Sequence, residues 1–279
     1  MLIFGATILV NTAFGLIVRA AQRAGVNVLA AGVVNYIFAS STFWVVYWLL
    51  KPPAATGALS IGAVAGSIYF VAYLLLLPAM QLRGVAIALA FVRLSVIIPL
   101  AAAMLIWREA PDTIKTCGIV LALLALPLLS LDRGVSSTRL TGGNIALLMS
   151  LFFVNGTCLL MSKWFQSTGL VAQRPLYLAT VFCVAGLGLT VAWMITRCEA
   201  LGYREIGWGI AIGAANAGSN LLILYTLDMF LASVMFPILA AVGLSLATVF
   251  AALAWREIPG RLGWSGIVIA VAAIILANR

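Results

Sequence analysis

Two apolar segments carry glycines and polar residues at helical spacing. In the first, Gly62, Gly66, Tyr69 and Tyr73 occupy positions i, i+4, i+7 and i+11, which share one face of a helix. The matching positions in the second are Gly209, Gly213, Asn216 and Asn220. Glycines one turn apart let helix backbones approach closely, and polar groups within a membrane should face protein or water. The pattern therefore indicates a polar cavity wall that hydrogen-bonds a substrate, with simple helix–helix contact as the alternative.

Other amides and phenols lie in the middle of apolar segments. Asn11 and Asn155 occupy similar places in two of these segments. An unpaired amide in hydrocarbon costs on the order of a few kcal/mol, so each must find a partner. We interpret the pair either as cavity walls or as a structural contact. Asn35, Tyr36 and Tyr177 are weaker candidates of the same kind.

Arg93 lies far inside an apolar segment. An arginine at mid-membrane costs roughly 2.5–3.5 kcal/mol on insertion scales, so its guanidinium should face protein or water. It is suited to holding a carboxylate or phosphate of an anionic substrate through two parallel hydrogen bonds. The alternatives are pairing with backbone carbonyls or reaching toward a loop. The candidate substrate-binding residues are therefore Asn11, Tyr69, Tyr73, Arg93, Asn155, Asn216 and Asn220.

The seven carboxylates all fall in loops or near the ends of apolar segments. Glu109 and Glu257 each follow an arginine, and we interpret them as interfacial ion pairs with Arg108 and Arg256. A pump that titrates a buried acid is thus poorly supported, which favours facilitated diffusion or exchange. Because histidine is absent and no phosphate-binding loop occurs, we expect no catalytic residues, no metal and no cofactor.

The composition indicates that most of the protein surface faces lipid, so the elements that position these residues must be membrane helices. Hydrophobic residues fill 65% of the 279 positions and charged residues 8%, whereas a soluble domain carries about 25% charged residues. The sequence predicts an all-α integral membrane protein with ten transmembrane helices. We expect them at 1–19, 29–50, 58–78, 84–107, 113–131, 142–163, 174–196, 206–227, 229–254 and 260–277. The first is interpreted as a membrane helix and not as a signal peptide.

Motifs recur between the two parts of the chain. The Trp-Arg-Glu-Ala-Pro sequence at 107–111 returns as Trp-Arg-Glu-Ile-Pro at 255–259, and Gly-Ile-Val at 118–120 returns at 266–268. The other matched pairs are Asn11 with Asn155, Gln22 with Gln166, Gly25 with Gly169, Gly62 with Gly209, and Gly66 with Gly213. The sequence predicts a first five-helix repeat at 1–131, a polar linker at 132–141 and a second repeat at 142–279. Five spans is an odd number, so the repeats should be inverted, an architecture typical of alternating-access transporters.

These motifs resemble the drug/metabolite transporter superfamily, in its ten-helix form with two EamA-like domains. The two Trp-Arg-Glu-x-Pro turns resemble the family's glutamate-bearing link between the fourth and fifth helices. The resemblance covers essentially the whole chain. It implies a cavity lined by helices one to four and six to nine, more peripheral helices five and ten, and cytoplasmic termini in a bacterial inner membrane.

The expected function is secondary transport of a small polar or amphipathic metabolite, such as an amino acid, organic acid or phosphorylated metabolite. A channel-like pore, a membrane scaffold and, less favoured, an intramembrane enzyme remain alternatives. The net charge of +9 is spread over the loops, which points to topology signals and lipid headgroups and not to nucleic acid. Counting basic residues favours the opposite orientation from the family, but a near-balanced repeat gives a small signal and we adopt the family's orientation. The expected partners are a substrate and the bilayer, with a homodimer left open.

Overall fold

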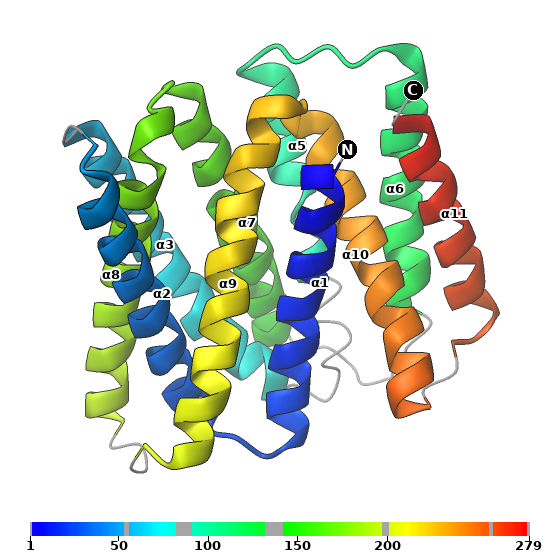
Figure 1. The fold of residues 1–279 in the computed structure, drawn as a ribbon. Helices are drawn as coiled ribbons and strands as arrows, with labels where there is room; N and C mark the ends of the chain where they lie inside the picture. The colour runs from blue at the N-terminus through cyan, green and yellow to red at the C-terminus, as the bar shows by residue number, and fades with distance from the viewer. Residues whose placement is uncertain are drawn as a thin grey trace. The chain divides into compact units, whose positions relative to one another are not determined.

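The computed structural model describes residues 2–52, 56–81, 91–131, 142–196, 201–256 and 259–277, and helices dominate these ranges (Figure 1). The helices are α1 (Leu2–Arg23), α2 (Val28–Leu50), α3 (Thr56–Gln81), α5 (Ile97–Leu105), α6 (Thr113–Leu131), α7 (Gly142–Ser167), η1 (Val171–Gln173), α8 (Arg174–Ile195), α9 (Tyr203–Met229), α10 (Ala232–Trp255) and α11 (Arg261–Ala277). Seven are long and apolar enough to cross a membrane, and three shorter apolar helices cover Phe91–Leu105, Thr113–Leu129 and Arg261–Leu276. In its described part the chain is an all-helical, multi-pass membrane protein.

The predicted spans coincide with helices to within about one turn, except the fourth. In the described part of the predicted span at 84–107, a turn at Ser95–Val96 separates a helical segment at 91–94 from α5. Pro99 explains the break, since it has no N–H to donate to the carbonyl of Ser95. That carbonyl instead accepts from the Ile98 N–H at 3.0 Å, a tighter three-residue step.

The described contacts divide the chain into two compact units. Unit 1 comprises Met1–Tyr73 and Trp164–Tyr225, and unit 2 comprises Leu74–Lys163 and Thr226–Arg279. Each unit therefore draws on both predicted repeats, 1–131 and 142–279. The predicted linker at 132–141 lies outside the described residues, and the repeat itself stays a prediction.

Unit 1 is built around α2 and α8, which lie side by side (Figure 1). Aromatic side chains fill the space between them: the ring of Phe43 stacks on that of Phe182 with centroids 5.9 Å apart, and Tyr36 also contacts Phe182. Tyr177 stacks on Phe165 at 4.1 Å and is buried. Tyr36 and Tyr177 thus lie in the aromatic core of this unit.

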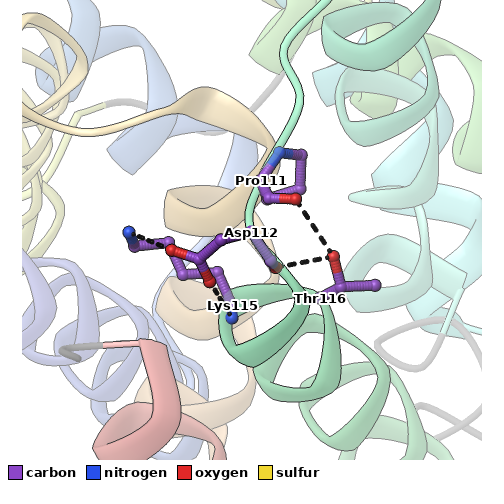
Figure 2. Close-up of polar contacts among 4 residues, drawn as sticks. All are labelled: Pro111, Asp112, Lys115 and Thr116. Carbon is purple, nitrogen blue, oxygen red and sulfur yellow. Dashed lines mark hydrogen bonds and ion pairs between the residues drawn. The ribbon is translucent and has the colours of Figure 1, made fainter.

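Unit 2 contains α6 and α11 packed along each other, with α10 against both (Figure 1). Gly266 allows α11 to approach α6 closely, because a Cβ at this position would lie 2.7 Å from the side chain of Leu129. The first of the repeated motifs leads into α6. Its following residue, Asp112, caps this helix by accepting from the Lys115 N–H at 2.8 Å and pairs with the Lys115 ammonium (Figure 2). These contacts hold the pKa of the Asp112 carboxyl below its usual value.

Candidate functional site

The two glycine faces predicted from the sequence both contact a neighbouring helix in unit 1. Gly62 and Gly66 of α3 face the backbone of α8: a Cβ at Gly66 would lie 2.6 Å from the carbonyl oxygen of Val181. Gly209 and Gly213 of α9 face the backbone of α2 in the same manner, and a Cβ at Gly213 would lie 2.8 Å from the carbonyl oxygen of Asn35. The glycines therefore bring helix backbones close enough for the polar residues one turn farther on to meet.

Three of those polar side chains, together with Asn35 of α2, form one hydrogen-bonded set in unit 1, which we call the polar network (Tyr69, Asn220, Asn216 and Asn35). The Tyr69 hydroxyl donates to Asn220 Oδ1 at 2.9 Å. Asn220 Nδ2 donates to Asn216 Oδ1 at 2.8 Å, and Asn216 Nδ2 donates to Asn35 Oδ1 at 3.1 Å. Asn35 and Asn216 are buried. The network thus joins α3, α9 and α2 through uncharged groups.

Two further predicted residues belong to unit 1. Asn11 of α1 donates through Nδ2 to the Ser219 hydroxyl of α9 at 3.0 Å. The Tyr73 hydroxyl donates to the carbonyl of Val28 at 2.6 Å, at the start of α2. Gly32, one turn along α2, provides the room for the Tyr73 ring, since a Cβ there would overlap the hydroxyl. Tyr73 therefore fastens α3 to α2 beside the polar network.

The remaining two predicted residues lie in unit 2, at the broken helix. Asn155 of α7 donates through Nδ2 to the Ser95 hydroxyl at 2.7 Å and to the carbonyl of Val92 at 3.2 Å. The Val92 carbonyl also accepts from the Ser95 hydroxyl at 2.6 Å, so Ser95 and Asn155 together replace the missing helical hydrogen bond. Arg93, half-buried, lies two residues before the turn. Of the seven candidates, the structure brings Tyr69, Asn216 and Asn220 together.

The first Trp-Arg-Glu motif places its glutamate in a buried ion pair of unit 2. The Glu109 carboxylate lies 2.8 Å from the Lys163 ammonium of α7, and the two side chains are 7% and 10% exposed. Its other oxygen accepts from the Ser233 N–H at 2.8 Å, in the first turn of α10. The ammonium also lies 5.7 Å from the centre of the Trp107 ring. One carboxylate therefore fixes the 106–112 loop to α7 and α10.

The predicted pairing of Glu109 with Arg108 is wrong. Arg108 is exposed and takes a left-handed conformation with φ of 52°, and the Glu109 N–H turns back to the carbonyl of Ala103 at 3.1 Å. This turn directs the carboxylate inward. Burial raises the pKa of Glu109, but the hydrogen bonds from Lys163 and Ser233 outweigh burial and hold this pKa below its ordinary value. Glu257, the second predicted ion-pair partner, lies outside the described residues.

Several matched positions of the two sequence halves also share a backbone conformation. Gly25 and Gly169 follow the first helix of each half, have φ of 71° and 73°, and donate to the carbonyls of Gln22 at 3.0 Å and Gln166 at 3.2 Å. Arg108 and Arg256, in the two copies of the motif, have φ of 52° and 55°. The matched residues therefore make the same turns.

Sequence reasoning ranked Asn35 too low and did not single out Lys163, Ser95 or Ser219 as site residues. The segment that contains Asn35 lacks the pair of glycines one turn apart that drew attention to Asn216 and Asn220. Lys163 lies near a segment end, where a lysine is ordinary, and its partner is far away in the sequence. Serines bonded to helix carbonyls are common in apolar helices, so Ser95 and Ser219 carried no signal of their own.

Comparisons with known proteins extend over nearly the whole chain. No protein-family model matches it. An uncharacterized protein of Haemophilus influenzae is 28% identical over 284 residues, which cover 96% of this chain and 94% of that protein. A solved structure, described only as the crystal structure of a protein, superimposes with a TM-score of 0.75 over 99% of this chain and 95% of the other, at 13% identity. At that identity the likeness shows a shared fold.

Proposed function

We propose that this protein is a secondary transporter that moves a small polar or amphipathic metabolite by alternating access. Its ten apolar helices would form two inverted five-helix repeats of the EamA type in a bacterial inner membrane. Partners are the bilayer and the substrate, and no ATP, metal or cofactor is needed. The observation that carries the proposal is the polar network in unit 1, an uncharged hydrogen-bonding site within apolar helices.

The position of this network favours substrate binding over a purely structural role. Helix contacts alone need only the glycine faces, which already bring α3 onto α8 and α9 onto α2. Four polar side chains in succession add desolvation cost that a purely structural contact avoids. A transporter needs such groups because a polar solute must exchange its water for protein hydrogen bonds within the membrane.

The matched contacts support the inverted repeat. Gly62 and Gly66 face carbonyls one turn apart on α8, and Gly209 and Gly213 face carbonyls one turn apart on α2. The third helix of each predicted repeat thus packs on the second helix of the other. Reciprocal packing of this kind is what a pseudo-two-fold relation between two five-helix repeats requires.

Counterflow in proteoliposomes tests the proposal. Purified protein is reconstituted with a high internal concentration of each compound of a metabolite library, and uptake of the same labelled compound from outside is followed. A thermal-shift screen chooses the compounds, since a specific ligand raises stability by mass action. We expect saturable uptake that an internal excess of the same compound stimulates.

Two results would overturn the proposal. An unsaturable conductance would indicate a pore, and the absence of flux for every ligand that raises the melting temperature would indicate a binding or scaffold protein. Empty liposomes and protein with Asn216→Leu serve as references, and the variant should lose uptake while remaining monodisperse.

A further inference from the structure

The hydrogen-bond direction of the polar network is fixed by one backbone group. Asn220 Nδ2 donates to the carbonyl oxygen of Asn216 at 3.0 Å as well as to its Oδ1. A carbonyl can only accept, so the amide nitrogen of Asn220 must face Asn216. Asn216 must then present its oxygen to Asn220 and its nitrogen to Asn35. Asn35 in turn presents Oδ1 to Asn216, and its own nitrogen faces away.

Asn35 therefore ends the network with two N–H donors. The residue is 3% exposed, and among the described residues its Nδ2 has no hydrogen-bond partner, whereas its Oδ1 accepts from Asn216. An amide nitrogen that no protein group satisfies remains available to an acceptor that comes to it. We propose that Asn35 Nδ2 is the substrate-recognition donor, and that it binds an uncharged carbonyl oxygen of the transported solute.

The chemistry of the network selects the carbonyl. Asn35, Asn216, Asn220 and Tyr69 carry no charge, and Asn11 and Ser219 in the same unit are also uncharged. A carboxylate bound to Asn35 would bring a full negative charge without a counter-charge from these groups, whereas an amide-type carbonyl would satisfy the donors without that cost. Solutes with an amide or similar carbonyl are thus the favoured class. This inference rests on the proposed function and gives its site a substrate class.

Matched pairs of small probes test the class on the purified full-length protein. N-acetylglycinamide and nicotinamide carry an uncharged amide, and N-acetylglycine and nicotinate replace it with a carboxylate. Binding is measured by thermal shift and by displacement of any counterflow substrate. We expect each amide to bind at least about tenfold more tightly than its carboxylate, because the carboxylate must lose its water without gaining a counter-charge.

Asn35→Asp supplies a signature that a merely structural asparagine would not give. When protonated, the new acid still accepts from Asn216 and offers one O–H donor; when ionised, it offers acceptors only. Amide binding by the variant should therefore persist near pH 5 and fall about tenfold or more as the pH rises and the acid ionises. Wild-type binding should stay level over this range, because the network's only titratable group is a phenol.

The control is Asn27→Asp on the same helix. Asn27 caps α2 by accepting from the N–H groups of Leu29 and Ala30, and an aspartate keeps that role. This variant should bind amides like wild type at both pH values. If Asn35→Asp does not fold, the role of Asn35 is tested by Asn35→Leu, which should lose amide binding, and by the preference of the wild type for amides over carboxylates.

The outcomes separate this inference from the proposed function. Counterflow of other solutes combined with no amide preference, or with amide binding unaffected by Asn35→Leu, would overturn the role of Asn35 and leave transport standing. Amide binding without any saturable flux would overturn transport and support the carbonyl site. Absence of both would overturn both.

Discussion

At the scale of single residues, the buried ion pair of Glu109 and Lys163 gives the largest expected effect. Glu109→Gln would leave the Lys163 ammonium buried without its counter-charge and weaken the acceptor for the Ser233 N–H. Breaking a buried pair from one side costs about 3–5 kcal/mol, so we expect a clearly lower melting temperature at neutral pH. Thermal unfolding followed by fluorescence in detergent measures this change.

The pH dependence of the same variant has a fixed sign. The pKa of Glu109 is lowered in the folded protein, so its contribution is complete above the ordinary glutamate pKa and is lost as the pH falls toward the lowered value. The difference in melting temperature between wild type and Glu109→Gln should therefore shrink below about pH 4.3. Asp112→Asn, an acid-to-amide change in the exposed pair with Lys115, should alter stability little. Equal losses in both variants would contradict the buried pair.

Helix packing depends on the glycine faces of α3 and α9. Gly66→Ala and Gly213→Ala would each place a Cβ within 3.0 Å of a backbone carbonyl oxygen, at 2.6 and 2.8 Å. Backbone cannot move aside as a flexible side chain can, so each should destabilise the protein by about 1–3 kcal/mol. Gly207→Ala, also on α9, meets nothing within 4 Å and should be neutral or stabilising by up to about 1 kcal/mol. Denaturant unfolding of the three variants compares them directly.

The broken helix should behave as a coupled element. Asn155→Leu removes the amide that donates to the Val92 carbonyl and to the Ser95 hydroxyl, and should cost about 1–3 kcal/mol. Pro99→Ala restores an N–H that can bond to Ser95, which favours a continuous helix in which Val92 no longer needs Asn155. The cost of Asn155→Leu should then be smaller in the Pro99→Ala background. Strict additivity in this double-mutant cycle would argue against the coupling.

The positions of the helices could be predicted from the sequence better than the contacts between them. Apolar length alone placed most helices, because lipid demands about twenty apolar residues per span, and glycine–polar spacing identified the faces of α3 and α9. The partners of polar residues could not be predicted from the local sequence, because Asn216 contacts Asn35 and Lys163 contacts Glu109 across long sequence separations. Pro99 breaks its helix through its own chemistry, but the Asn155 amide that donates to the Val92 carbonyl comes from another helix.

At the scale of the whole molecule, the ion pair bears on how many helices cross the membrane. Lys163 lies one turn before the end of α7, so its pair with Glu109 holds the 106–112 loop at that end of the helix. Ten crossings with cytoplasmic termini would put both Ala110 and Ser167 inside and Arg23 outside. If only the seven long helices crossed, Ala110 would lie outside with Arg23.

Cysteine labelling decides between these arrangements. Arg23, Ala110 and Ser167 are exposed, and each is changed to cysteine in a background in which the four native cysteines are replaced. A membrane-impermeant maleimide applied to intact cells should label Arg23→Cys alone, and lysed cells should label all three. Labelling of Arg23→Cys and Ala110→Cys in intact cells would indicate seven crossings. Labelling of Ala110→Cys and Ser167→Cys without Arg23→Cys would indicate ten crossings in the opposite orientation. Equal labelling of Arg23→Cys and Ser167→Cys would contradict the inverted repeat, because these matched positions must lie on opposite sides of the membrane when each repeat has an odd number of spans.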